Sequence, residues 1–352
     1  MGKPLPIAAK LVATVNMGVT PAALALTPDG RFAYVANNNN YGMTGEDSVT
    51  VVDLTNFTVL TTINNTSFNQ PYTITIDKQG QFAYATNSNF QNVTVIDVAT
   101  NDVIQVIAGF DGPSGFAISA DGGTAYVNNY GAPGGAQSGN GQTVSVVNLN
   151  SRLVTGKISV GLAPAALTMS PDGKYCYVIN YGKGIFNDGS ISVIDTATNT
   201  VARTIAGIGL FGPFGIAVLN NGAANIGYIT NFGSNNFVPV GRHVLAVNLD
   251  SGQVLSTIPV GIQPSGVAIS ADGAFACVTN YNTLYSDITN YTGLTAGQGT
   301  VNMIDLSTNR LLPLTIPVGQ SPSAVALSVD ARHAYVTNYS SNTLSVIELT
   351  FA

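Results

Sequence analysis

The chain is poor in charged and chemically reactive side chains. Only 9% of its 352 residues are charged, against roughly 25% in an average globular protein. With 12 basic and 18 acidic residues the formal charge is −6, so no basic surface for nucleic acid or an anionic membrane is expected. Two histidines are too few for a multi-histidine metal centre. The composition therefore favours neither nucleic-acid binding nor transition-metal chemistry.

Several segments and motifs with a known physical use are missing. No run of eighteen or more apolar residues is present, so no membrane-spanning helix is expected. The start, "MGKPLPIAAK", lacks the apolar core of a secretory signal. Haem attachment through C-x-x-C-H, the G-x-S-x-G elbow and a phosphate-binding P-loop are also absent. Few lysines and many Asn, Thr and Gly suit an extracellular, cell-surface or periplasmic protein, while a cytoplasmic one stays open.

A repeat of about fifty residues runs through the whole chain. Each copy begins at a proline followed by a segment such as "AALALTPDG" or "SGVAISADG", in which small and large side chains alternate as in a β-strand. These segments align without gaps. Such a period indicates a repeat architecture. The anchoring prolines are Pro21, Pro71, Pro113, Pro164, Pro213, Pro264 and Pro322.

Each copy contains four strand-like segments. An Asp-Gly turn leads from the first to a second of the kind "RFAYVAN", then come a third of the kind "SISVID" and a fourth of the kind "VLSTIPVG". Four antiparallel strands in seven copies predict an all-β, seven-bladed β-propeller spanning residues 1–352. The last copy lacks its fourth strand, and "LVATVNMGVTP" near the start matches "VLSTIPVGIQP". Residues 10–18 are therefore predicted to complete blade seven and to close the ring.

The second strands carry the most specific signal in the sequence. "YVINY", "CVTNY" and "YVTNY" end three of them, and the units around them resemble the YVTN family of β-propeller repeats from Leu11 to Leu349. The resemblance implies a seven-bladed ring and a binding role in a surface-layer, cell-surface or periplasmic protein. Propellers of similar shape include lactonases, so an enzyme remains an alternative. One departure is Cys277, which replaces the usual tyrosine. Cys277 and Cys176 are predicted to be buried free thiols.

The connections between second and third strands vary most in length. Nineteen residues lie between Asn280 and Thr300, whereas four suffice between Asn338 and Thr343. A ring needs only the short form, so the long loops of blades one, three, four, five and six are the functional candidates. We expect them on one face, at the mouth of the central channel. Whether residues 281–299 cover the channel stays open.

An asparagine ends every second strand, and the next position is often aromatic. The asparagine amides either face a polar ligand or bond the neighbouring backbone. The aromatic rings offer stacking faces for a sugar or a peptide, or pack as part of the rim. The candidate ligand-binding residues are Asn129, Asn180, Asn280, Tyr130, Tyr181, Phe232, Tyr281, Tyr339 and, beside the mouth prolines, Tyr72 and Phe214.

Few charges remain once those repeated in every blade are set aside. His243 stands at the start of a third strand, where other blades have Ser, Asn or Thr. A catalytic set would come from His243, Arg242, Asp188, Glu46 and Asp47. Carboxylate and carbonyl oxygens could also hold Ca²⁺, but no D-x-D-x-D-G motif is present, and no metal site or cofactor is predicted.

Two classes of function stay open at this stage. The first is a non-catalytic binding or surface-interaction protein, monomeric, whose long loops present a protein, peptide, glycan or small polar ligand site. The second is a lactonase-like hydrolase or a lyase with its pocket at the channel mouth. The scarcity of catalytic residue types favours the first.

Overall fold

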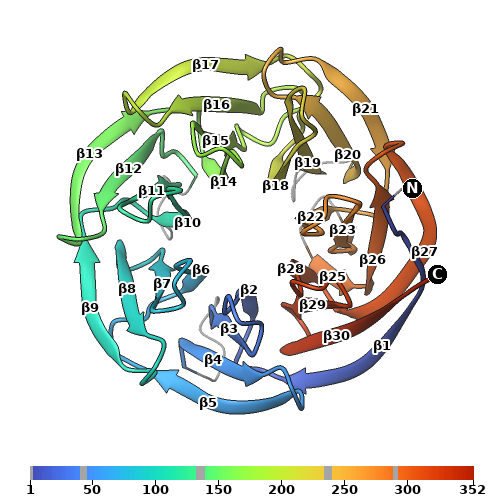
Figure 1. Cartoon of the computed structure of the whole chain (residues 1–352), viewed down its shortest axis with the longest axis horizontal. Coiled ribbons are helices and arrows are strands. Elements are labelled where there is room, and N and C mark those ends of the chain that lie inside the picture. Colours follow the sequence, from blue (N-terminus) through green and yellow to red (C-terminus); the bar gives the residue numbers. More distant parts are fainter. Residues whose placement is uncertain (1–2, 40–45, 132–138, 234–239, 288–291) are drawn as a thin grey trace.

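The computed structural model describes residues 3–39, 46–131, 139–233, 240–287 and 292–352, which form seven four-stranded antiparallel sheets around one axis (Figure 1). Blades one to six are β2–β5, β6–β9, β10–β13, β14–β17, β18–β21 and β22-β23-β26-β27, and blade seven is β28-β29-β30-β1. The predicted seven-bladed propeller is confirmed.

Within each blade, strands are ordered from the axis outward. The innermost strands are β2 (Pro21–Leu26), β6 (Pro71–Ile76), β10 (Pro113–Ile118), β14 (Pro164–Met169), β18 (Pro213–Asn220), β22 (Pro264–Ile269) and β28 (Pro322–Leu327). The second strands are β3 (Phe32–Asn37), β7 (Phe82–Asn87), β11 (Thr124–Asn129), β15 (Tyr175–Asn180), β19 (Asn225–Gly233), β23 (Phe275–Asn280) and β29 (His333–Asn338). Every innermost strand thus begins at an anchoring proline.

The outer two positions complete each sheet. The third strands are β4 (Ser48–Asp53), β8 (Asn92–Asp97), β12 (Thr143–Asn148), β16 (Ser190–Asp195), β20 (Val240–Asn248), β26 (Gln298–Asp305) and β30 (Thr343–Phe351). The outermost strands are β5 (Thr58–Asn64), β9 (Val103–Ala108), β13 (Leu153–Ser159), β17 (Thr200–Ala206), β21 (Val254–Pro259), β27 (Arg310–Gln320) and β1 (Pro6–Asn16). A hairpin, β24 (Thr283–Asp287) with β25 (Thr292–Ala296), lies in the blade-six loop.

The two ends of the chain meet in blade seven, where β1 pairs antiparallel with β30 (Figure 1). Pairing runs from Pro6 opposite Phe351 to Asn16 opposite Thr343, so the closing strand starts earlier than the predicted residues 10–18. On the inner side, the Ser323 hydroxyl donates to the carbonyl of Pro21 in blade one, 3.0 Å away. Residues 17–20 join β1 of blade seven to β2 of blade one, and the hydrogen bonds between β1 and β30 close the ring.

Apolar side chains between neighbouring blades make the core. In the described part of the chain, a hydrophobic cluster lies between each pair of blades, such as Tyr34, Val51 and Ile74 between blades one and two. Cys176 and Cys277 belong to this core as buried, unpaired cysteines, as predicted. The described residues contain no helix long and apolar enough to cross a membrane.

The repeated tyrosine of the second strand bonds the outer turn of the next blade in blades one, three and five. The hydroxyls of Tyr126 and Tyr228 each lie 2.7 Å from a side-chain oxygen in the outer turn of the next blade, that of Asn199 and Asn309 respectively. Blade seven has no such turn, because its outer strand comes from the start of the chain. Tyr177 in blade four keeps the tyrosine although its hydroxyl has no hydrogen-bond partner, so the missing turn does not account for Cys277, and the structure gives no other reason for that replacement.

Removal of residues 1–20 tests the closure of the ring. The deletion leaves β30 as an unpaired edge and uncovers the blade-seven core, so we expect the melting temperature to fall by about 10 °C or more. Thermal unfolding followed by circular dichroism measures the change. An unchanged melting temperature would show that β1 does not hold the ring together.

The tyrosine link between blades is tested by Tyr126→Phe. Loss of the hydroxyl leaves the Asn199 oxygen without its donor, so the free energy of unfolding should fall by about 1 kcal/mol. The matched control is Tyr175→Phe on the same kind of strand, where a change within about 0.5 kcal/mol is expected. Equal effects of the two substitutions in urea unfolding would contradict the assigned role.

Candidate functional site at the ring axis

A buried asparagine clamps the end of each second strand to the third strand. The Nδ2 atom of Asn180 donates to the hydroxyls of Ser190 and Ser192 at 3.1 and 3.0 Å, and Asn338 bonds Thr343 and Ser345 in the same way. Equivalent bonds hold Asn37, Asn87, Asn129 and Asn280. Because the Nδ2 group of each amide is paired within the blade, it fixes the course of the chain that follows. The Oδ1 atoms of four of these amides are buried without a hydrogen-bond partner, those of Asn37, Asn180, Asn280 and Asn338.

The residue after the asparagine is placed next to the axis by a second repeated bond. Its backbone N–H donates to the carbonyl of the residue before the anchoring proline, for example from Tyr181 to Ala163 at 2.8 Å. The same bond occurs in all seven blades. The residues so placed are Asn38, Ser88, Tyr130, Tyr181, Phe232, Tyr281 and Tyr339. Five of the seven positions are aromatic, and the two polar ones are adjacent, in blades one and two.

The residue before each anchoring proline adopts the left-handed backbone conformation. Ala163 has φ 54° and Gln263 has φ 53°, a region that costs a non-glycine residue free energy. Gly212, with φ 48°, occupies this place in blade five, where an added Cβ would lie 2.1 Å from the Gly233 carbonyl oxygen. The seven-fold use of this costly conformation indicates that the chain path beside the axis is fixed by the fold.

Aromatic side chains from six blades gather at the axis. We call Tyr72, Tyr130, Tyr181, Phe214, Phe232, Tyr281 and Tyr339 the axial aromatic cluster. Along one side the rings follow one another from Phe214 to Phe232, Tyr281 and Tyr339, with centroid distances of 5.4, 5.7 and 6.4 Å. Phe232 is buried and the others are half-buried. The seven aromatic residues predicted as ligand-binding therefore lie together, while ligand contact itself remains a prediction.

Tyr72 lies near tyrosines from opposite sides of the cluster. Burial raises the pKa of Tyr72, and so do the nearby phenols of Tyr130, Tyr339, Tyr281 and Tyr181, which come from blades three, seven, six and four. Residues from such widely separated blades approach one another only at the axis. Desolvation also raises the pKa values of Tyr130 and Tyr181. The phenols are therefore neutral at physiological pH.

The three candidate asparagines lie behind the aromatic cluster. Asn129, Asn180 and Asn280 are at most 1% exposed, and each donates to side chains of its own third strand. Their Nδ2 groups thus make the structural bonds that were one of the two alternatives, while ligand contact by these asparagines remains a prediction.

The catalytic candidates of blade five are His243 and Arg242. His243 takes the place of the clamping hydroxyl, because its Nε2 lies 2.7 Å from Nδ2 of Asn231. An amide N–H donates to an imidazole nitrogen only if that nitrogen is unprotonated, and burial lowers the pKa of His243. Arg242 is exposed, and its carbonyl accepts a bond from the backbone of Val260.

The Asp188 side chain forms hydrogen bonds within its own loop in blade four. Its carboxylate accepts hydrogen bonds from the backbone N–H groups of Lys183 and Ile185, at 2.6 and 3.2 Å. It also lies near enough to Tyr181 to raise the pKa of that phenol. Asp188 therefore shapes the loop beside the aromatic cluster.

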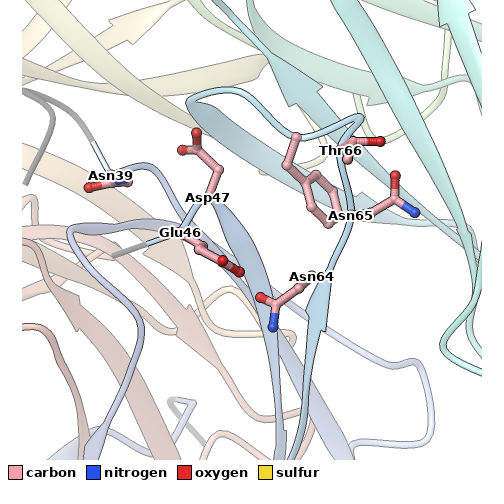
Figure 2. Close-up of a pocket in the computed structure, with 7 residues that line it drawn as sticks. Asn39, Glu46, Asp47, Asn64, Asn65 and Thr66 are labelled. Atoms are coloured by element: carbon pink, nitrogen blue, oxygen red, sulfur yellow. The ribbon is translucent and has the colours of Figure 1, made fainter. Parts of the chain in front are cut away.

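Glu46 and Asp47 line a separate cavity of about 420 Å³ formed by blade one and its connection to blade two. Figure 2 shows the two carboxylates lying between Asn39 on one side and Asn64, Asn65 and Thr66 on the other. Asp47 Oδ1 accepts a bond from the backbone N–H of Gln70 at 3.0 Å, and burial raises the pKa of Asp47. The catalytic candidates thus lie in blades one, four and five.

The sequence did not single out the amide-rich wall of this cavity. Phe68 belongs to that wall and stands three residues before Pro71, where blades one, four, six and seven have a glycine. That departure from the repeat was the available signal. The tips of four long loops lie outside the described residues: 40–45, 132–138, 234–239 and 288–291. Whether the loop of residues 281–299 covers the channel therefore stays open. No group of three or more metal-ligating side chains occurs among the described residues.

Comparison with known proteins supports the propeller assignment. Residues 6–103 match the family described as "Lactonase, 7-bladed beta-propeller". The seven-bladed beta-propeller protein Rv1057 of Mycobacterium tuberculosis is 26% identical over 133 residues, which are 38% of this chain and 31% of that protein. The chain thus matches about a third of that relative's length.

A solved structure matches nearly the whole ring. A chain of Kuenenia stuttgartiensis hydrazine synthase superimposes with a TM-score of 0.74 and 22% identity, over 94% of this chain and 95% of that one. At this identity the likeness shows the fold alone.

The clamp by His243 makes stability depend on pH. The pKa of His243 is lower in the folded protein than its ordinary value of 6.5, so the unfolded chain binds the proton more tightly. The stability that neutral His243 confers is present above pH 6.5 and is lost as the pH falls below it. When the pH is lowered from 7.5 to 5.5, the melting temperature of the wild type should therefore fall by more than that of His243→Ser. This variant carries the serine that stands at the equivalent positions 48 and 190.

The control for this experiment is His333→Ser, which removes the other histidine. His333 packs against Phe57 and Tyr335. Identical pH dependence of melting in the wild type and His243→Ser would contradict the assignment.

Proposed function

We propose that the protein is a non-catalytic binding β-propeller, which holds a ligand over the axial aromatic cluster with the long loops around it. The observation that carries this proposal is the convergence at the axis of aromatic side chains from six blades. Partly exposed aromatic residues held in fixed positions are typical of ligand-binding surfaces. A protein, a peptide or a glycan is the expected partner class.

The positions of the catalytic candidates also support binding without turnover. His243 is part of an asparagine clamp, Asp188 closes its own loop, and Glu46 and Asp47 lie at another cavity. General acid–base catalysis needs such groups within hydrogen-bond reach of one reacting centre. The YVTN-type repeats and the low charge favour a cell-surface, periplasmic or secreted setting for such a binding protein.

A lactonase-like hydrolase is the second candidate. It is favoured by the match of residues 6–103 to a lactonase family. That segment includes the carboxylates of Glu46 and Asp47 and most of their cavity wall. Under this alternative, Asp47 would take a proton from a water molecule that attacks the carbonyl carbon of a bound lactone. Glu46 would be the second carboxylate of the site.

Binding and turnover are separated by one set of variants. We expect peptide and glycan arrays to give ligands whose affinity falls about tenfold or more in Tyr281→Ala or Tyr339→Ala, because a buried aromatic anchor is lost. Tyr175→Ala, at the opposite end of a second strand, is the control and should bind normally. Hydrolysis of a panel of lactones is measured in parallel. Turnover that is abolished by Asp47→Asn would establish the enzyme instead.

A further inference from the structure

The axial aromatic cluster has no charge with which to recognise an ion. Its seven members are five tyrosines and two phenylalanines, and the two remaining positions of the ring beside the axis are Asn38 and Ser88. A phosphate or carboxylate group brought here would lose its water without gaining an opposite charge, which is costly. The nearby carboxylate, that of Asp188, already accepts hydrogen bonds from the backbone of its own loop. The site chemistry therefore points to a neutral ligand.

The cluster offers tyrosine hydroxyls as well as ring faces. Tyr72 interacts with the phenols of four tyrosines around it. The Tyr181 hydroxyl donates to the Gly233 carbonyl at 2.8 Å, which fixes the ring and leaves its oxygen as an acceptor. Each phenol is both donor and acceptor, the property that matches a hydroxyl group on a ligand.

An apolar wall lies beside these hydroxyls. The rings of Phe214 and Phe232 lie side by side in blade five, with centroids 5.4 Å apart and planes inclined by 35°. Phe232 then meets Tyr281 nearly edge-on, at 66°. Successive rings are thus tilted along a curved lining, and the site combines apolar ring surface with convergent hydroxyls.

We propose that the ligand of the axial aromatic cluster is a neutral saccharide, held by the hydroxyls of Tyr72, Tyr281 and Tyr339 and packed against Phe214 and Phe232. The proposal rests on the binding function proposed above and names its ligand class. A sugar ring has an apolar C–H face and a rim of hydroxyl groups, which are complementary to these two features of the site. Burial raises the pKa of Tyr72, so its phenol stays protonated and keeps its hydrogen-bond donor.

A cationic ligand fits this arrangement less well. Recognition of a quaternary ammonium uses aromatic faces turned toward the charge. Here five of the seven members carry a hydroxyl, which a quaternary ammonium, having no N–H, cannot use as a hydrogen-bond acceptor. This distinction makes the two ligand classes separable by removing hydroxyls while keeping the rings.

The test is a titration of the full chain with uncharged oligosaccharides of different linkage, using maltohexaose, cellohexaose and chitohexaose as probes. Choline and oligogalacturonate serve as cationic and anionic comparisons. Isothermal calorimetry measures binding to the wild type and to Tyr72→Phe, Tyr281→Phe and Tyr339→Phe. Each loses one hydroxyl and keeps its ring, so affinity should fall about three- to tenfold per substitution. Tyr126→Phe, which removes an inter-blade hydroxyl, is the matched control and should bind with wild-type affinity.

A second readout needs no variant. Saturation of the aromatic protons of the wild-type protein should transfer magnetisation to the C–H protons of the bound sugar ring.

The outcomes distinguish this proposal from the one on which it rests. An uncharged oligosaccharide that binds the wild type, loses affinity in the Phe variants and receives the transferred saturation supports it. Failure of all three oligosaccharides, or unchanged affinity in folded Phe variants, overturns the saccharide assignment. If choline, oligogalacturonate or an array peptide then binds and loses affinity in Tyr281→Ala, the binding function stands without it. Lactone turnover abolished by Asp47→Asn overturns both.

Discussion

The hydrogen bond from the asparagine at the end of each second strand to the third strand is the interaction on which the rest of the site depends. It is buried, and its donor atom, Nδ2, makes bonds with closely similar geometry in blades one, three, four and seven. When this amide is held, the next residue lies beside the axis, and its backbone N–H donates to the carbonyl of the residue before the anchoring proline. Buried polar groups that are paired in this way specify a unique arrangement. Function can then vary at the following position without loss of the ring.

Much of the fold could be predicted because the repeat fixes it locally. The prolines, the alternation of small and large residues and the missing last strand defined the blades and the closure by β1. The aromatic positions after the asparagines were also visible. In the sequence, Cys277 was visible only as a departure from the tyrosine found at this position of the other repeats. The structure places it in the hydrophobic core between blades six and seven and gives no reason for the change from tyrosine.

The parts that could not be predicted depend on geometry across the ring. Nothing in the chain near Tyr72 shows that its phenol lies close to tyrosines of blades six and seven, because that contact depends on the radius of the closed ring. His243 was conspicuous because it interrupts a row of hydroxyl residues. The same interruption fits a catalytic base or a substitute hydrogen-bond acceptor, and only the 2.7 Å contact with Asn231 shows which bond it makes. The carboxylates were scattered along the sequence, and the fold leaves them in different blades.

The central claim is that ligand contacts the convergent phenols at the axis. The most direct measurement is an NMR titration with tyrosine labelled by ¹³C at Cζ, in which each ring reports its own hydroxyl environment as an oligosaccharide is added. Our account predicts shifts for Tyr72, Tyr281 and Tyr339, while the inter-blade tyrosines Tyr126 and Tyr228 stay unchanged. Binding that leaves the axial resonances in place, or shifts only the inter-blade ones, would contradict it.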